Sequence, residues 1–167
     1  GVYLFSDGEK YEGDWYDDKQ HGKGTFYFSN NNKYDGLWYT DYQEGLGTMY
    51  YFNGDKYVGN WHEDLREGEG TYTWANGVFY KGGWKADKKS GKGLFDWKDG
   101  SSYYGGMDND MRNGHGTYYY ANGDKYIGEF SNLMTNMYVG TGFKKWGMTF
   151  SNLAAKIITD KIMGREN

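Results

Sequence analysis

The 167-residue sequence contains no cysteine, no proline and few aliphatic side chains. Without cysteine the chain forms neither a disulfide scaffold nor a thiolate metal site, and its composition suits a reducing compartment. The missing proline fits a chain of interior β-strands, because proline cannot donate to a β-ladder. No run approaches the ~20 apolar residues of a membrane span, and no signal-peptide pattern opens the sequence.

Aromatic residues compensate for the shortage of aliphatic ones. Leu, Ile, Val and Phe together number only 24, a low share that in a highly charged chain indicates disorder. Here the net charge is only −4, and 19 Tyr and 7 Trp supply surface that can be buried. The balance of 19 basic against 23 acidic residues also argues against nucleic-acid binding, which requires a clustered basic surface. The sequence therefore predicts a folded chain with an aromatic core.

One 23-residue pattern dominates the sequence. A tyrosine recurs at this step, at Tyr11, Tyr34, Tyr57, Tyr80, Tyr103 and Tyr126, and each is followed two residues later by Gly. Four residues after these tyrosines stand Trp15, Trp38, Trp61 and Trp84, then Met107 and Phe130. A Gly-x-Gly pair closes each unit, from Gly22/Gly24 to Gly114/Gly116, and a stretched sixth unit places its pair at Gly140/Gly142. Such a period is the signature of repeat architectures.

Two turn signals in every unit predict one β-hairpin per repeat. The first is Asn or Asp, usually followed by Gly, as at Asn53-Gly54 and Asn76-Gly77. The second is an Asp between the Trp position and the Gly pair, a series that comprises Asp18, Asp41, Asp64, Asp87 and Asp110. Two short strands and two turns then account for the whole repeat.

The strand register follows from the requirement that aromatic residues share one face. Pairing Trp15 with Gly22 would place Gly13 opposite Gly24 and Tyr11 opposite Phe26. A three-residue turn at 75–77 then pairs Trp74 with Val78 and Tyr72 with Tyr80. A two-residue Asn-Gly turn is rejected, because it would turn the next strand's aromatic residues to the other face.

This register predicts a sheet with one aromatic and one polar face. In the first unit Tyr11, Trp15, Phe26 and Phe28 share a face with the glycines, and polar residues such as Lys10, Glu12 and Lys23 occupy the other. Because glycine has no side chain, each ring can lie close to the facing backbone. The predicted repeat core comprises Tyr11, Trp15, Tyr34, Trp38, Tyr57, Trp61, Tyr80, Trp84, Tyr103 and Tyr126.

The array is predicted to occupy residues 1–150, as a half repeat, five full repeats and one stretched, irregular repeat. Because the sequence starts within a repeat and without Met, we expect it to be a fragment of a longer chain. After Phe150 the pattern decays, and Leu153, Ala154, Ile157, Ile158 and Ile162 recur at helical spacing. Residues 151–167 are therefore predicted to form a short amphipathic helix that packs on the last repeats as a cap.

The unit Tyr-x-Gly-x-Trp, followed by Gly-x-Gly-Thr and a later Asn-Gly, resembles the MORN (membrane occupation and recognition nexus) repeat. Residues 11–28 are a close match, and the resemblance covers residues 1 to about 150. The chain departs from the family pattern in the Asp18-to-Asp110 series, where the family commonly has Gly, and at Met107. The resemblance implies an elongated, single-layered array with a curved groove. It also implies non-catalytic work, such as scaffolding, dimerisation or attachment to the cytoskeleton or a membrane edge.

These observations together predict an all-β fold, a single-layer solenoid of antiparallel β-hairpins with a short C-terminal capping α-helix. No enzyme is predicted, because no nucleophile, base and orienting group stand together. The Gly-x-Gly pairs lack the spacing and following helix of a phosphate loop. His21, His62 and His115 occupy different repeat positions and make no metal-ligand spacing. We expect no cofactor and no metal.

The Asp series has a local explanation. Asp in a turn usually hydrogen bonds to its own backbone, and we expect this here. Cation binding between repeats is less favoured, because neighbouring repeats are about 10 Å apart, two strand spacings of ~4.8 Å.

A single sheet with an aromatic face leaves part of that face uncovered. Exposed apolar patches of this kind usually mark a partner site, and a groove suits an amphipathic helix or a second copy of the chain. The candidate groove residues are outer aromatics near the turns and their neighbours: Phe28, Met49, Tyr51, Trp74, Phe95, Trp97 and Tyr120. Each of them could instead pack against the next repeat.

Two other functions stay open at this point. Lys10, Lys33, Lys56 and Lys125 share one repeat position, and an anionic lipid surface attracts each such residue by about 1 kcal/mol. Acidic neighbours offset this attraction, so a peripheral membrane or phosphoinositide-binding adaptor with weak lipid contact is the alternative. The array could also be the regulatory region of a larger enzyme. We expect a cytoplasmic location, at the cytoskeleton or membrane periphery, and the composition suggests a protist source.

Overall fold

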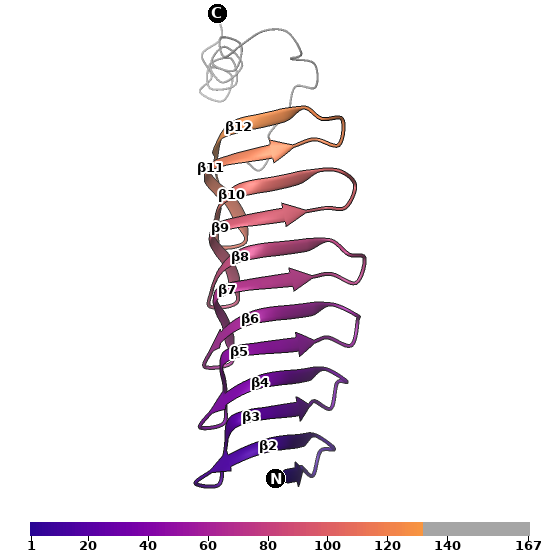
Figure 1. Ribbon diagram of the computed structural model, residues 1–167, viewed down its shortest axis with the longest axis vertical. Coiled ribbons are helices and arrows are strands. Elements are labelled where there is room, and N and C mark those ends of the chain that lie inside the picture. Colours follow the sequence, from indigo (N-terminus) through magenta and orange to yellow (C-terminus); the bar gives the residue numbers. More distant parts are fainter. Residues whose placement is uncertain (132–167) are drawn as a thin grey trace, which may run out of the picture. The chain divides into compact units, whose positions relative to one another are not determined.

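The computed structural model describes residues 1–131, which form one antiparallel sheet of twelve strands (Figure 1). Each strand pairs with its neighbours in chain order. The strands are β1 (Val2–Leu4), β2 (Lys10–Tyr16), β3 (Lys19–Tyr27), β4 (Lys33–Tyr39), β5 (Tyr42–Tyr50), β6 (Lys56–His62), β7 (Leu65–Thr73), β8 (Phe79–Lys85), β9 (Lys88–Asp96), β10 (Ser102–Asp108), β11 (Met111–Tyr119) and β12 (Lys125–Phe130). The predicted single-layer array of hairpins is confirmed.

The predictions for the later part of the chain lie outside the described residues. They are the helix over 151–167, the array's end at residue 150 and the stretched unit with Gly140 and Gly142. Residues 1–131 contain no helix, and thus none that could cross a membrane.

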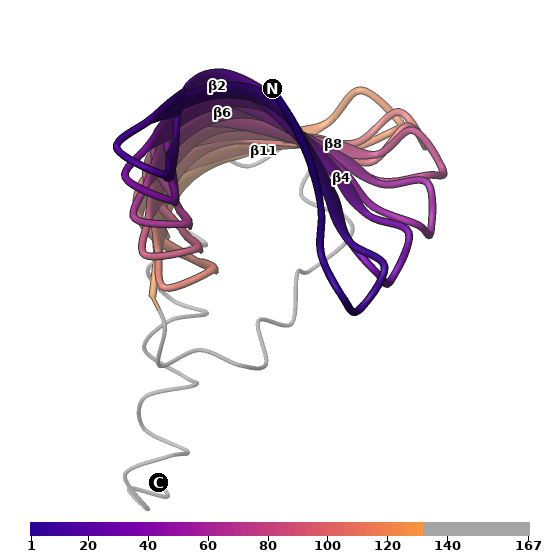
Figure 2. The ribbon, with the colours of Figure 1, turned by 90° about the horizontal axis from the view of Figure 1, so that it is seen from below.

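Viewed along its long axis, the sheet is arched, with one row of turns on each side (Figure 2). Three-residue turns form one row: the Trp74 amide donates to the Val78 carbonyl at 2.9 Å, and Gly77 has the left-handed φ of 86°. This is the turn that the sequence predicted. Two-residue turns form the other row, and in the turn from β8 to β9 both Ala86 and Asp87 have positive φ. Two positive φ values are the requirement of a type I′ turn.

The predicted register is correct for half of each hairpin and wrong for the other half. Tyr11 pairs with Phe26 and Gly13 with Gly24, as expected. Trp15, however, pairs with Gln20 instead of Gly22, because a β-bulge follows Gly13. Gly22 adopts a φ of 65° and pairs with Trp38 of the next repeat. The extra residue of a bulge breaks the alternation on which the prediction relied.

The buried core is built from the repeating tyrosines. Tyr57 is 0% exposed, and the rings of Trp61 and Trp84 approach it edge-on, each with its centroid 5.2 Å away. Its hydroxyl donates to the Asn60 carbonyl at 3.0 Å. The ring lies directly over Gly70, where an added Cβ would come within 2.5 Å of the ring's Cζ atom. The tyrosine therefore requires glycine on the facing strand.

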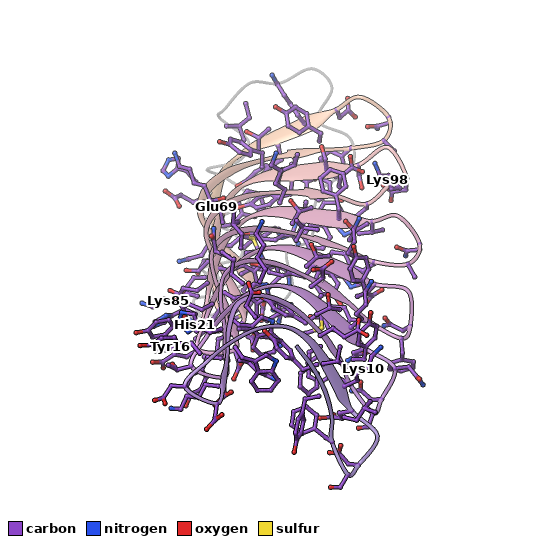
Figure 3. All side chains as sticks on the ribbon, turned by 60° about the horizontal axis from the view of Figure 1, so that its bottom comes forward. Lys10, Tyr16, His21, Glu69, Lys85 and Lys98 are labelled. Carbon is purple, nitrogen blue, oxygen red and sulfur yellow. The ribbon has the colours of Figure 1, made fainter. Side chains whose placement is uncertain are left out.

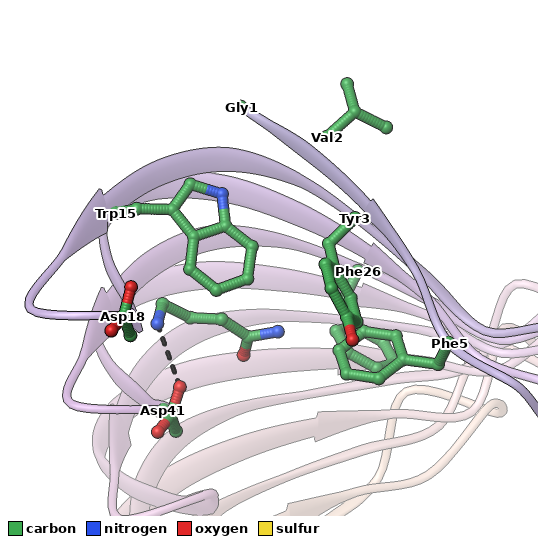
Figure 4. Close-up of a pocket in the computed structure, with 9 residues that line it drawn as sticks. Gly1, Val2, Tyr3, Phe5, Trp15, Asp18, Phe26 and Asp41 are labelled. Carbon is green, nitrogen blue, oxygen red and sulfur yellow. Dashed lines mark hydrogen bonds between the residues drawn. The ribbon is translucent and has the colours of Figure 1, made fainter.

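Tryptophan joins the second, third and fourth repeats each to the repeat before it. The Trp38 indole donates to the Gly24 carbonyl at 3.1 Å, and Trp84 donates to Gly70 at 3.2 Å. Trp38, Trp61 and Trp84 are at most 5% exposed, whereas Trp15 at the first repeat is 36% exposed. The aromatic face is the concave face of the arch, as the positions of Trp15 and Phe26 beneath the ribbon show (Figure 4).

Candidate functional site

The concave face carries an unbroken row of aromatic side chains beside the three-residue turns. The row, called the ring ladder below, comprises Tyr51, Tyr72, Trp74, Phe95, Trp97, Tyr118 and Tyr120, all half-buried. Successive centroids are 5.6, 4.7, 5.2, 4.6, 5.4 and 4.8 Å apart. Each inner ring packs on two neighbouring rings of the ladder, and each end ring packs on one. The ladder therefore belongs to the core and also forms a continuous apolar surface.

The candidate groove residues fall into three groups in the structure. Five of them belong to the ring ladder. Phe28 belongs to a shorter row that contains Phe5 and Phe26, with centroids 5.5 and 4.6 Å apart. Met49 is 8% exposed and lies in the buried core. The sequence analysis did not select Tyr72 and Tyr118, although they share one repeat position and their spacing was a usable signal.

The Asp series borders the opposite side of the concave face and has a different role from the one predicted. Four of the five carboxylates accept a hydrogen bond from the backbone of the preceding repeat rather than from their own turn. The Oδ1 atoms of Asp41, Asp64, Asp87 and Asp110 accept from the amides of Gln20, Gln43, Arg66 and Lys89 at 2.8, 2.8, 3.0 and 3.0 Å. These four aspartates also have left-handed φ values between 66° and 71°. Asp therefore serves both as a turn residue and as a tie between repeats.

A third series at the 23-residue step, which the sequence analysis missed, lies between the Asp series and the rings. Its members are Gln20, Gln43, Arg66, Lys89 and Arg112. The Arg66 guanidinium lies 4.5 Å from the Trp84 ring centroid and donates from Nε to the Asp87 carboxylate at 2.8 Å. The Lys89 ammonium lies 5.6 Å from the same ring and pairs with Asp110 at 3.0 Å. The third, fourth and fifth repeats thus place their own cations against the aromatic face.

At the first repeat the concave face contains a pocket of about 680 Å³ (Figure 4). Its apolar walls include Trp15, Tyr3 and Phe26, and its polar lining is Asp18, Gln20 and Asp41. Within residues 1–131 no basic side chain forms an ion pair with Asp18, Asp41 or Asp64. The pocket therefore combines aromatic walls with carboxylates that have no partner cation among residues 1–131.

Comparison with known proteins identifies the repeat. The MORN repeat family matches five consecutive units, residues 11–33, 34–56, 57–79, 80–102 and 103–125. The chain belongs to the MORN repeat family. MORN repeats are non-catalytic modules of protein and membrane interaction. No curated protein sequence matches the chain.

Solved structures also match the MORN array. One is the TCP domain of SAS-4 (dCPAP) of Drosophila melanogaster, in complex with a proline rich motif of Ana2 (dSTIL). The two are 16% identical, with a TM-score of 0.45, and the match covers 76% of this chain. It spans 62% of that chain's length.

Burial and hydrogen bonding shift several pKa values in the MORN array. Burial raises the pKa of Tyr11 to about 12 and also raises the pKa of Tyr57 and Tyr80. Burial opposes ionisation of Asp110 as well, but hydrogen bonds from the Lys89 amide and ammonium outweigh it and lower the pKa of that carboxyl. The same balance lowers the pKa of Asp55, which accepts from the Tyr72 hydroxyl at 2.7 Å. These tyrosines are neutral and these carboxylates ionised near neutral pH.

The convex face offers fewer groups for recognition. Of the proposed lipid-binding lysines, Lys10 pairs with Glu12 at 2.8 Å, and the Lys33 ammonium lies 4.4 Å from the Tyr50 ring centroid. His21 projects outward beside Tyr16 (Figure 3), with the two ring centroids 5.6 Å apart. In the described part of the chain, no three His, Asp or Glu side chains gather as a metal site.

Proposed function

We propose that this MORN array is a non-catalytic interaction and scaffold module that binds an amphipathic helix of a protein partner along its concave face. The ring ladder carries this proposal. Seven aromatic side chains in mutual contact remain half-buried on one face of a one-layer sheet. A contiguous apolar surface of this kind favours a partner, and a helix laid in a groove is a common way to cover one.

The two sides of the concave face favour an amphipathic partner over a uniformly apolar one. One side presents the ring ladder, and the other presents the aspartates, including Asp41 and Asp64, which have no ion pair within residues 1–131. An occupant would need an apolar stripe for the rings and polar or basic groups for the aspartates. A scaffold at the cytoskeleton or membrane periphery of the cytoplasm is part of the proposal.

The test removes rings from the ladder and from the convex face in parallel. Trp74→Ala/Trp97→Ala shortens the ladder at two rings that each contact Phe95. We expect it to weaken partner binding at least tenfold, since buried aromatic anchors dominate interface energies by roughly 2 kcal/mol or more each. The control, Tyr104→Ala/Tyr119→Ala, removes two exposed rings from the opposite face and should leave binding unchanged.

Crosslinking and pull-down with the wild type and both variants measure this binding, and thermal unfolding shows whether each variant is folded. A folded ladder variant that retains its partner would refute the proposal. Self-association that is lost with the ladder would identify a second copy as the occupant instead. Salt-sensitive binding to anionic vesicles that is lost in Lys10→Glu/Lys33→Glu/Lys56→Glu would favour the membrane alternative.

A further inference from the structure

The third and fourth repeats show what kind of group this concave face accommodates. The Arg66 guanidinium lies among three rings, with centroids of Tyr57, Tyr72 and Trp84 at 5.7, 5.6 and 4.5 Å. It donates to the Asp87 side chain and to the Asp87 carbonyl, at 2.8 and 2.9 Å. The Arg66 side chain is only 19% exposed. A cation held between aromatic faces and a carboxylate is thus an integral part of the repeat.

The first repeat contains the same surroundings without the cation, and the second repeat contains them with Met49 in place of one ring. At the place equivalent to Arg66 stands Gln20, and the three equivalent rings are Tyr11, Phe26 and Trp38. Trp38 lies 5.4 Å from the Tyr11 centroid and 5.9 Å from the Phe26 centroid, so these rings are assembled in the same way. The Asp41 carboxylate accepts a hydrogen bond from the backbone amide of Gln20 at 2.8 Å, just as the Asp87 carboxylate accepts one from the backbone amide of Arg66. Only the charged head group is missing.

The second repeat adds an unsatisfied acceptor. Gln43 is 5% exposed, and its Oε1 atom is buried without a hydrogen-bond donor among the described residues. Asp64 accepts the Gln43 backbone amide at 2.8 Å but meets no cation within residues 1–131. A buried acceptor without a donor is costly, and such groups indicate a ligand or water that completes them.

We propose that Asp41 and Asp64 each bind a Lys or Arg side chain of the partner, which supplies the cation that Arg66 and Lys89 supply from within the chain. This inference rests on the proposed function and specifies its partner: a polypeptide segment with two basic side chains. The pocket of about 680 Å³ gives access to the first of these sites, because Gln20, Phe26 and Asp41 line it (Figure 4). Trp15, 36% exposed, provides an additional ring face for the cation.

The distance between the two sites sets the spacing of the basic residues. Equivalent positions in consecutive repeats are two strands apart, about 10 Å. An α-helix places residues i and i+7 on one face about 10.5 Å apart. A polyproline II segment places residues i and i+3 on one face about 9.3 Å apart. The partner should therefore present Lys or Arg pairs at one of these spacings, next to apolar residues that reach the ring ladder.

A phage-displayed library of random linear peptides, selected on the purified chain, tests this proposal without knowledge of the natural partner. We expect the enriched peptides to carry Lys or Arg pairs at i, i+7 or i, i+3. Their affinities are then measured by isothermal titration calorimetry against the variant Gln20→Arg/Gln43→Arg. This variant places an Arg66-like side chain in each site, and we expect each substitution to weaken binding roughly 5- to 30-fold.

Added positive charge alone could weaken the binding of a basic peptide, so the control variant carries the same charge elsewhere. Leu46→Arg/Val58→Arg adds two arginines at exposed positions of the convex face, and we expect it to change the affinity less than about twofold at moderate salt. If Gln20→Arg/Gln43→Arg does not fold, Asp41→Asn/Asp64→Asn removes the two charges while it keeps an acceptor for each backbone amide.

The outcomes separate this inference from the proposed function. One outcome would overturn the cation sites and leave the ring ladder as the binding surface. In it, the enriched peptides lack basic residues, bind Gln20→Arg/Gln43→Arg as tightly as the wild type, and no longer bind Trp74→Ala/Trp97→Ala. A selection that enriches no peptide would overturn both. Basic peptides that bind Gln20→Arg/Gln43→Arg as tightly as they bind the wild type would also overturn the cation sites.

Discussion

Replacing Gly70 by alanine should destabilise the array strongly, although it adds only one methyl group. The new Cβ would lie 2.5 Å from Cζ and 2.6 Å from Cε2 of Tyr57, and closer still to the hydroxyl oxygen. The ring has no room to retreat, because Tyr57 is 0% exposed and lies between the rings of Trp61 and Trp84. Either the ring or the facing strand must therefore move.

The expected cost has two parts. Forcing an extra methyl group into a packed core costs about 1–3 kcal/mol. A displaced Tyr57 ring also loses the hydrogen bond from its hydroxyl to the Asn60 carbonyl, now 3.0 Å long, at about 1–2 kcal/mol. The sum, about 2–5 kcal/mol, is a large part of the 5–15 kcal/mol that typically stabilises a domain. It corresponds to a decrease in Tm of roughly 4–20 °C for a chain of this size, at about 2–4 °C per kcal/mol.

Thermal and urea unfolding, followed by tryptophan fluorescence, measure this cost. The matched control is Gly77→Ala, a glycine with a φ of 86° whose added Cβ would meet no backbone atom within 4 Å. Only the left-handed conformation opposes this change, at about 1–2 kcal/mol. If Gly70→Ala unfolds within about 3 °C of the wild type, or is no less stable than Gly77→Ala, the close seating of the tyrosine on glycine is refuted.

Three further predictions concern the hydrogen bonds of Asp87 and the shifted pKa values of Tyr11 and Asp55. Asp87→Ala should lower the free energy of unfolding in urea by about 2 kcal/mol. Asp87→Asn should lower it by less than half of that, because Asn keeps an acceptor for the backbone amide of Arg66. Equal losses in the two variants would contradict the role of the side-chain oxygen. Burial raises the pKa of Tyr11 to about 12 in the folded state. The contribution of neutral Tyr11 to stability is therefore complete at pH values below its unfolded-state pKa of about 10, and it is lost as pH rises through the folded-state pKa. The tyrosinate absorbance of Tyr11, measured as the difference between the wild type and Tyr11→Phe, should accordingly rise together with unfolding, and a rise of this difference in the folded state would argue against burial. The pKa of Asp55 is lowered in the folded state, so ionised Asp55 contributes to stability above its unfolded-state pKa of about 3.9, and this contribution is lost as pH falls through the folded-state pKa. The difference in stability between the wild type and Asp55→Asn should therefore narrow in acid. A difference that stays constant would exclude the ionised carboxylate as its cause.

Local rules were sufficient to predict the repeat and its faces. The constant step from Tyr11 to Tyr126, the Asn-Gly turns and the alternation of side chains along a strand depend only on residues near one another in the sequence. They therefore determined the hairpins, the three-residue turn at 75–77 and the pairing of Tyr11 with Phe26. They also separated the aromatic face from the polar one.

Contacts between repeats were decided only in the tertiary structure. The bulge that moves Trp15 opposite Gln20 depends on Gly22, whose left-handed backbone is not readable from a period. Asp87 bonds to the backbone of the preceding repeat because the arch brings the next turn to that place, whereas the sequence suggested its own turn. The charged head group of Arg66 lies among rings from two repeats, and such a meeting requires the register, the bulge and the stacking of hairpins together. The sequence by itself determined which face is aromatic, and the packing of one hairpin on the next decided which of its groups have partners.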